Sequence, residues 1–246
     1  MNIEIKREEL LISQLADLLV HDKHVAVGAA SPIPGAAALL AKEEAKAKDR
    51  RLRVTILHSN KYNNFTDGAR ELFDCAAQGR VDTFFLGGVQ IDGQANINLV
   101  GTGEYPKVNK RFPGSFGSAL MYFVVPQIIL FREEHSPRTL VNKVDFISAP
   151  GISEDKIYRP GGPKYLLTNR ALFKFNKLSQ RFSLLSLNHN NTIDDIIKLT
   201  GFDFDIDNNI SEIVNPDINR LEILRDIIAP MVAEFYPEFA KKIWNV

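Results

Sequence analysis

Short apolar runs alternate with helical patterns along the first third of the chain. The runs at residues 24–29, 52–58 and 81–88 are rich in Val, Ile, Leu and Phe, and each is followed by turn-forming residues. The stretches between them, 36–47 and 66–78, have the composition and apolar spacing of helices. Strands joined through helices pair in parallel, because the helix carries the chain back along one face of the sheet. The pattern predicts an α/β protein with an open, doubly wound and mostly parallel sheet.

Further strand-like runs occur later in the chain. Two lie at residues 127–133 and 143–150, and three more follow one another closely at 164–169, 171–176 and 181–188. Consecutive strands without a helix between them are joined by tight turns and pair antiparallel. We therefore expect a late cluster of mixed or antiparallel strands at one side of the sheet.

The chain shows no internal repeat, heptad array or low-complexity segment. Its 246 residues suit one large domain or two small ones, and we expect a single domain over residues 1–246. The polar stretch 203–216 is the best candidate for an exposed connection. Ligands of open α/β sheets bind beyond the carboxyl ends of strands, so functional residues are expected in the loops that follow them.

Composition restricts the partners and the compartment. Thirty Lys and Arg balance thirty Asp and Glu, so the formal net charge is zero, which argues against a nucleic-acid binder. The longest apolar stretch, 120–131, is interrupted by Pro126 and is shorter than the ~20 residues that span a bilayer. A single cysteine, Cys75, excludes an internal disulfide and a Cys-rich zinc site. We expect a cytoplasmic protein that binds neither nucleic acid nor membrane.

Familiar phosphate-binding and metal-binding motifs are absent. The sequence contains neither a GxxxxGK[ST] loop nor a GxGxxG loop. Asp203, Asp205 and Asp207 imitate the start of a calcium loop, but Asn208 and Val214 stand where that loop needs Gly and Glu. We therefore expect no metal site.

The segment 87–98 has the highest density of glycine and polar residues. Gly87 and Gly88 end an apolar strand, so their backbone can approach a ligand closely and their amides can face a developing oxyanion. Gln90 and Asp92 follow them and are candidate catalytic residues. The alternative is a β-turn whose polar side chains bind their own backbone. We expect the two glycines to form part of the wall of the site, so that Gly88→Val abolishes turnover and leaves the fold intact.

Several strings of the sequence resemble motifs of the family I coenzyme A transferases, in particular of the glutaconate-type β-subunits. Residues 87–98 (GGVQIDGQANIN) resemble G-A-x-Q-[VI]-D-x-x-G-N-I-N, and 111–119 (RFPGSFGSA) resemble R-[LF]-P-G-S-G-G-[SA]. Residues 144–151 (VDFISAPG) resemble V-D-[FY]-I-T-S-P-G, and matches at 161–163 and 200–203 follow in the family's order. The motifs cover nearly the whole chain.

The resemblance implies the CoA-transferase fold and a separate α-subunit, with the active site where the two subunits meet. Members of the family pass CoA between carboxylates through a glutamyl–CoA thioester, so an acyl-CoA thioester is the implied substrate, without a metal or organic cofactor. Arginine and lysine can bind the phosphates of CoA. The residues expected to contact CoA or the acyl group are Lys107, Arg111, Gly114, Ser115 and Gly117.

The sequence departs from the family at three positions. The nucleophilic glutamate of the glutaconate-type β-subunits falls on His58, and an imidazole cannot form a glutamyl thioester. Phe116 and Ala95 each stand where the motif has glycine. We expect His58 to line the catalytic cleft, as a hydrogen-bond donor to the thioester oxygen or a general base on water. The alternative is a core histidine bonded to a backbone carbonyl.

Three functions remain open. The first is the β-subunit of a CoA-transferase-like enzyme in a hetero-oligomer. The second resembles relatives that open a ring of a steroid-derived CoA thioester by hydrolysis, with the catalytic glutamate on the partner chain. The third is a non-catalytic subunit that binds acyl-CoA.

Overall fold

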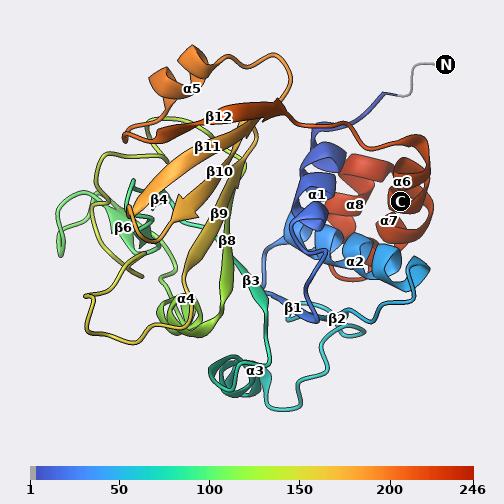
Figure 1. Cartoon of the computed structure of the whole chain (residues 1–246). Helices are drawn as coiled ribbons and strands as arrows, with labels where there is room; N and C mark the ends of the chain where they lie inside the picture. The colour runs from blue at the N-terminus through green and yellow to red at the C-terminus, as the bar shows by residue number, and fades with distance from the viewer. Residues whose placement is uncertain (1–3) are drawn as a thin grey trace. The chain divides into compact units, whose positions relative to one another are not determined.

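The structure is a computed structural model that describes residues 4–246 (Figure 1). It divides into two compact units. One contains the chain up to Phe85 together with Val214–Val246, and the other contains Leu86–Ile213. The single domain over the whole chain stays a prediction.

The sheet of the first unit is parallel. Its central strand, β1 (His24–Val27), pairs in parallel with β2 (Arg53–Ile56) and with β3 (Thr83–Leu86). All residues of β1 and β3 are buried, as expected for strands covered on both faces. These strands are the apolar runs that the sequence predicted.

Helices from both ends of the chain complete the first unit. They are α1 (Arg7–Asp17), α2 (Pro32–Ala47), α3 (Gly68–Ala77), α6 (Ile218–Glu222), the π-helical turn η1 (Ile223–Ile228), α7 (Ala229–Ala233) and α8 (Pro237–Trp244). Figure 1 shows α1 and α2 in blue beside α6–α8 in red, so segments far apart in sequence lie side by side. Glu9 of α1, which is fully buried, forms an ion pair with Arg225 of η1 at 2.7 Å.

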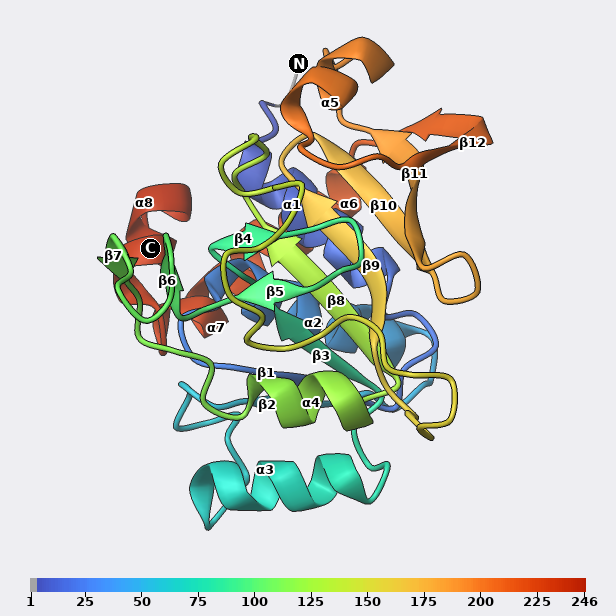
Figure 2. The same ribbon diagram turned by 90° about the vertical axis from the view of Figure 1, so that its left-hand side faces the viewer.

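The sheet of the second unit is mixed (Figure 2). Its strands are β8 (Gln127–Arg132), β9 (Pro163–Thr168), β10 (Ala171–Asn176), β11 (Arg181–Leu187) and β12 (Asp205–Glu212), and they lie in this order across the sheet. β9, β10 and β11 pair antiparallel, whereas β8 pairs with β9 and β12 pairs with β11 in parallel. The late antiparallel cluster and the mostly parallel α/β fold are confirmed.

Two small hairpins and two helices surround this sheet. The hairpins are β4 (Gln90–Ile91) with β5 (Ile97–Asn98) and β6 (Gly101–Thr102) with β7 (Lys110–Arg111). The helices are α4 (Ser118–Val124) and α5 (Ile193–Leu199). In the described residues, no helix is both long and apolar enough to cross a bilayer.

One predicted element is wrong, and another contains a strand that was not expected there. Residues 143–150 were expected to form a strand, but only an isolated bridge joins Ala149 to Ile97. The segment lies along the β4–β5 hairpin, where this short backbone bridge and hydrogen bonds to the side chains of Gln90 and Asp92 hold it. The stretch 203–216, expected as an exposed connection, is exposed at most of its described residues and also contains the edge strand β12, which pairs with β11.

Candidate functional site

The loop after β2 carries His58. The loop folds back on the strand, since Ser59 N donates to Ile56 O at 3.1 Å. The His58 side chain is exposed, and its ring stacks on Tyr236 with ring centroids 5.1 Å apart and an interplanar angle of 10°. The alternative of a core histidine is therefore wrong. Its exposed ring nitrogens can reach a substrate, so its place in a catalytic cleft stays a prediction.

A carboxylate that sequence reasoning missed braces the same loop. Ser59 is 3% exposed, and its Oγ donates to Glu234 Oε2 at 2.6 Å. The backbone N–H of Asn60 donates to Glu234 Oε1 at 3.0 Å. Glu234 directly follows α7 and is separated from Ser59 by 175 residues, so no spacing in the sequence links them. The contact orients the loop that presents His58.

Tyr236 joins this loop to the loop after β1. Its hydroxyl oxygen accepts a hydrogen bond from Ser31 N at 2.8 Å, next to the start of α2. Burial raises the pKa of Tyr236, although the hydrogen bonds from Ser31 and Ala30 oppose the shift. The phenol thus stays protonated near neutral pH. His58 and Ser31 lie beyond the carboxyl ends of neighbouring parallel strands, where α/β proteins place their sites.

In the second unit, Gln90 belongs to a closed polar network. Its Oε1 accepts from Asn98 Nδ2 at 2.7 Å and from Asp145 N at 3.0 Å, and its Nε2 donates to Asp145 Oδ2 at 3.1 Å. Asp145 Oδ2 also accepts from Gly103 N at 2.8 Å. Gln90 is 7% exposed. Its side chain therefore ties the β4–β5 hairpin to the segment around Asp145.

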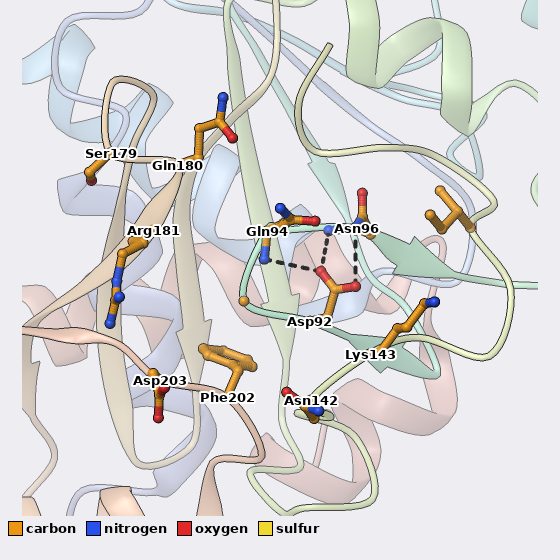
Figure 3. A pocket seen from close by; sticks show the side chains of 12 residues that line it. Asp92, Gln94, Asn96, Asn142, Lys143, Ser179, Gln180, Arg181, Phe202 and Asp203 are labelled. Carbon is orange, nitrogen blue, oxygen red and sulfur yellow. Dashed lines mark hydrogen bonds between the residues drawn. The ribbon is translucent and has the colours of Figure 1, made fainter. Parts of the chain in front are cut away.

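Asp92 holds the turn of this hairpin (Figure 3). Its Oδ1 accepts from Gln94 N at 3.1 Å and from Asn96 N at 3.0 Å, and its Oδ2 accepts from Asn96 Nδ2 at 3.1 Å. A longer bond from Val144 N at 3.4 Å reaches the following segment. Asp92 is 4% exposed. The geometry is that of the self-bonded turn, and a direct catalytic role for Gln90 or Asp92 stays a prediction.

Gly87 and Gly88 lie at the end of β3, as predicted. A Cβ on Gly88 would lie 2.6 Å from Gln90 O, and one on Gly87 would lie 3.0 Å from Phe131 O. Both positions therefore need glycine, because a side chain would come too close to a backbone carbonyl oxygen. The expectation that Gly88→Val leaves the fold intact is wrong, because the side chain would displace the hairpin. Whether the two glycines face a thioester stays a prediction.

The predicted CoA-contacting residues lie in the loop of the β6–β7 hairpin, on β7 and after it. Lys107 and Arg111 are exposed, and Arg111 pairs with Gly101 across the β6–β7 hairpin. Gly114 is partly exposed and has φ +105°. Ser115 O accepts from Ser118 N at 2.8 Å, and Gly117 precedes α4. The two cations are available to a phosphate, but their contact with CoA stays a prediction.

The two departures from the glycine motif share one backbone feature. Phe116 has φ +42° and Ala95 has φ +59°. Both lie in the left-handed region, where a Cβ is sterically unfavourable. Phe116 is 85% exposed, whereas Ala95 is fully buried. The chain therefore keeps a glycine-type conformation at two positions where it has no glycine.

A pocket of about 550 Å³ lies beside the Asp92 turn (Figure 3). Its lining includes Lys143, Arg181 and the ring of Phe202. Arg181 pairs with Asp205 at 3.4 Å. Of the predicted site residues, Asp92 alone lines this pocket. Within residues 4–246, no group of three or more His, Cys, Asp or Glu side chains is arranged to hold a metal ion.

The comparisons with known proteins show the family. The profile of the coenzyme A transferase family matches residues 5–199, and the chain belongs to this family. It is 29% identical over 153 residues to the β-subunit of glutaconate CoA-transferase from Acidaminococcus fermentans, covering 59% of this chain and 56% of the relative. It is 30% identical over 161 residues to the β-subunit of 3-oxoadipate CoA-transferase from Pseudomonas knackmussii, covering 63% and 62%. The chain thus spans about three fifths of the length of these curated relatives.

Solved structures show the same fold. The glutaconate CoA-transferase of A. fermentans superposes with a TM-score of 0.80 at 20% identity, covering 94% of this chain and 97% of that one. The decarboxylase AibA/AibB superposes with a TM-score of 0.76 at 23% identity, covering 91% and 95%. IpdAB of Rhodococcus jostii superposes with a TM-score of 0.73 at 21% identity, covering 93% of this chain and 96% of that one. The predicted CoA-transferase type of fold is confirmed.

Proposed function

We propose that this chain is the β-type subunit of an enzyme that acts on an acyl-CoA thioester together with a partner chain. The observation that carries the proposal is the exposed His58 at the end of β2, where the family resemblance places the nucleophilic glutamate. Each of the two curated relatives is by name one of the subunits of its enzyme, which supports a partner of the α type. The single cysteine is consistent with a reducing compartment such as the cytoplasm.

In the proposed site, His58 takes the place of the nucleophile. Its ring donates a hydrogen bond to the thioester oxygen or accepts a proton from water, while Tyr236 holds the ring plane and Glu234 braces the loop. Gly87 and Gly88 form a backbone wall. Lys107 and Arg111 are proposed to bind the phosphates of CoA, because both cations are exposed on the β6–β7 hairpin.

The reaction class depends on where a carboxylate nucleophile lies. CoA transfer requires a glutamyl thioester, which His58 cannot form, so a transferase needs its glutamate on the partner chain. The alternative is a reaction without such an intermediate, for example the ring-opening hydrolysis of a steroid-derived CoA thioester. The absence of glutamate at position 58 favours this second candidate. The fold supports more than one chemistry, since a decarboxylase and a CoA-transferase are among the similar structures.

The test is to trap the intermediate on the assembled complex. The tagged chain is purified with its untagged partner, incubated with acyl-CoA thioesters, treated with borohydride or hydroxylamine, digested and analysed by mass spectrometry. A modified glutamate on the partner supports transfer. Turnover without an adduct on either chain supports hydrolysis.

Two outcomes would contradict the proposal. A modified glutamate on this chain would refute the assignment of His58 to the nucleophile position. Stoichiometric binding of acyl-CoA without turnover by any complex would leave the chain with a binding role alone. A His58→Glu variant serves as the positive control, because an adduct on the peptide that carries position 58 shows that this loop faces the thioester.

A further inference from the structure

Arg159 is half-buried, and within the described residues its hydrogen bonds go to neutral groups. Its Nη2 donates to Tyr122 O at 2.9 Å and its Nη1 donates to Ser153 Oγ at 3.4 Å. Its guanidinium lies over the rings of Tyr122 and Phe123, with its central carbon 5.2 and 5.7 Å from the ring centroids. The buried Nε has no hydrogen-bond partner in the described part of the chain. The aromatic rings, Ser153 and the backbone thus fix the plane of the guanidinium and satisfy only part of its five N–H donors.

A second cation approaches the same place. Lys177 Nζ donates to Gly161 O at 3.2 Å. Gly162 has φ +143°, and a Cβ built on it would lie 3.6 Å from Lys177 Cε and 3.7 Å from Arg159 Nε. The absent side chain at Gly162 therefore leaves room between the two cations. Both Arg159 and Lys177 line a cavity of about 160 Å³.

Two carboxylates line the cavity, and one of them pairs with a cation outside it. Glu154 and Asp155 also line the cavity, but Glu154 pairs with Lys156 at 3.0 Å. Burial lowers the pKa of Arg159. Burial and then the charge of Arg159 lower the pKa of Lys177. Two like charges held beside one cavity repel each other unless an anion lies between them.

We propose that this cavity, whose lining includes Arg159, Lys177 and Gly161, binds a phosphate-type oxyanion. An oxyanion in the cavity can accept charge-assisted hydrogen bonds from the guanidinium of Arg159 and from the ammonium group of Lys177, which both line it. The cavity is small enough for one such group. The phosphate has two sources, free inorganic phosphate or a phosphate group of CoA, and for the second source the inference rests on the proposed function.

The test measures binding of inorganic phosphate to the full chain by calorimetry at constant ionic strength. Lys177→Met removes one charge and keeps most of the stem. We expect it to weaken the Kd for phosphate about ten-fold or more, which corresponds to roughly 1.4 kcal/mol or more. Lys174→Met is the matched control, since Lys174 is an exposed lysine of β10 outside the cavity, and it leaves the Kd unchanged. Arg159→Lys keeps the charge but loses the planar guanidinium with its paired N–H donors, and we expect it to weaken phosphate binding as well.

Stability in phosphate-free buffer gives an independent readout. Because the positive charge of Arg159 disfavours a second positive charge beside it, we expect Lys177→Met to melt at a temperature no lower than the wild type without phosphate. It should also lose the rise in melting temperature that phosphate produces. Absence of phosphate binding to the wild type, or equal binding by Lys177→Met, would overturn the proposal.

Competition with CoA and 3′-dephospho-CoA then identifies the source. If CoA displaces the bound phosphate and 3′-dephospho-CoA does not, the site binds the 3′-phosphate of CoA. Displacement by neither assigns it to free phosphate. Displacement by both assigns it to the pyrophosphate. Because phosphate binding is measured without turnover, a failed CoA reaction does not affect this result.

Discussion

His58 combines two properties that a substituted nucleophile position needs. It is exposed at the end of a buried strand, and its ring plane is set by stacking on Tyr236. Stacked aromatic pairs contribute about 0.5–1.5 kcal/mol beyond burial, so the ring is held without losing access to its nitrogens. This arrangement is compatible with proton transfer and not with a glutamyl thioester.

The first prediction concerns His58→Gln, which keeps a polar side chain but removes the titratable ring. A general acid or base contributes ~10²–10⁴-fold to catalysis. We expect kcat of the assembled enzyme to fall by about 10²-fold or more, with a smaller change in KM, as measured by steady-state kinetics on the acyl-CoA it turns over. His21→Gln, another exposed histidine of the first unit, is the control. Wild-type kcat in His58→Gln would exclude a catalytic role.

The second prediction concerns the left-handed backbone at Phe116. The left-handed region costs a residue with a Cβ about 1–2 kcal/mol, and glycine avoids this cost. Comparing Phe116→Gly with Phe116→Ala separates the backbone from the lost ring, since both variants lose the ring. We expect the glycine variant to be about 1 kcal/mol more stable than the alanine variant in urea unfolding. Equal stabilities would show that the backbone is unstrained here.

At the scale of elements, one buried carboxylate connects three helices of the first unit. Glu9 on α1 accepts from Arg225 of η1 at 2.7 Å and from Trp244 of α8 at 3.2 Å. Burial alone would raise the pKa of Glu9, but the bonds from Arg225 and Lys6 outweigh it and lower the pKa below its usual 4.5. The ionised form is therefore favoured by folding.

The third prediction is the pH dependence of this contact. Since folding lowers the pKa of Glu9, its contribution is present above pH 4.5 and is lost as the pH falls through the lower folded value. We expect the free energy of unfolding of Glu9→Gln to be about 1.5–3 kcal/mol lower than that of the wild type at pH 7, which is the range for a hydrogen bond to a charged group. This difference in the free energy of unfolding between variant and wild type becomes smaller as the pH falls below 4.5. Glu238→Gln, on the exposed surface of α8, is the control, and a deficit that is constant with pH would refute the explanation.

The fourth prediction tests whether Asp92 is structural. Asp92→Asn places an amide group among the N–H donors of Gln94, Asn96 and Val144, so at least one donor loses its acceptor. An unsatisfied buried donor costs about 1–3 kcal/mol. We expect faster hydrogen exchange at the backbone amides of 92–98 and 144–151, measured by mass spectrometry. Unchanged exchange with abolished turnover would instead indicate a direct catalytic role.

At the scale of the whole molecule, a buried histidine affects stability in mild acid. His135 is 5% exposed, and its two ring nitrogens lie 2.8 Å from Thr168 Oγ1 and 3.0 Å from Thr200 Oγ1. Burial, and then the charge of Arg170, lower the pKa of His135 from 6.5 to about 4. Between these values the unfolded chain binds a proton that the folded chain does not, so stability falls as the pH decreases.

The fifth prediction follows from this loss of stability as the pH decreases. We expect the free energy of unfolding to fall by up to about 1.4 kcal/mol per pH unit between pH 6.5 and pH 4 because of His135 alone. The measurement is urea unfolding across this range, monitored by a probe in the second unit. His135→Gln, which does not titrate, should show a shallower slope. The same slope in wild type and variant would rule out His135 as the cause.

The sequence by itself determined the features that depend on local periodicity. Apolar runs bounded by turn residues predicted β1, β2, β3 and the late antiparallel strands, because burial on a sheet requires that pattern wherever the chain folds. The same local information located Gly88 and Phe116 in motif strings. It could not show that Gly88 is needed by its own hairpin, since the limiting contact is with Gln90 O.

Only the tertiary structure decided which distant segments meet. Glu234 reaches Ser59 across 175 residues, and Lys177 reaches Gly161 beside Arg159. The expected connection 203–216 became the strand β12 because β11 offered an unpaired edge, and 143–150 stayed irregular because Gln90 and Asp92 bind it through side chains. The periodicity of apolar residues indicates which side of each segment is buried. Which segments pair with one another depends on packing and hydrogen bonding that exist only once the chain is folded.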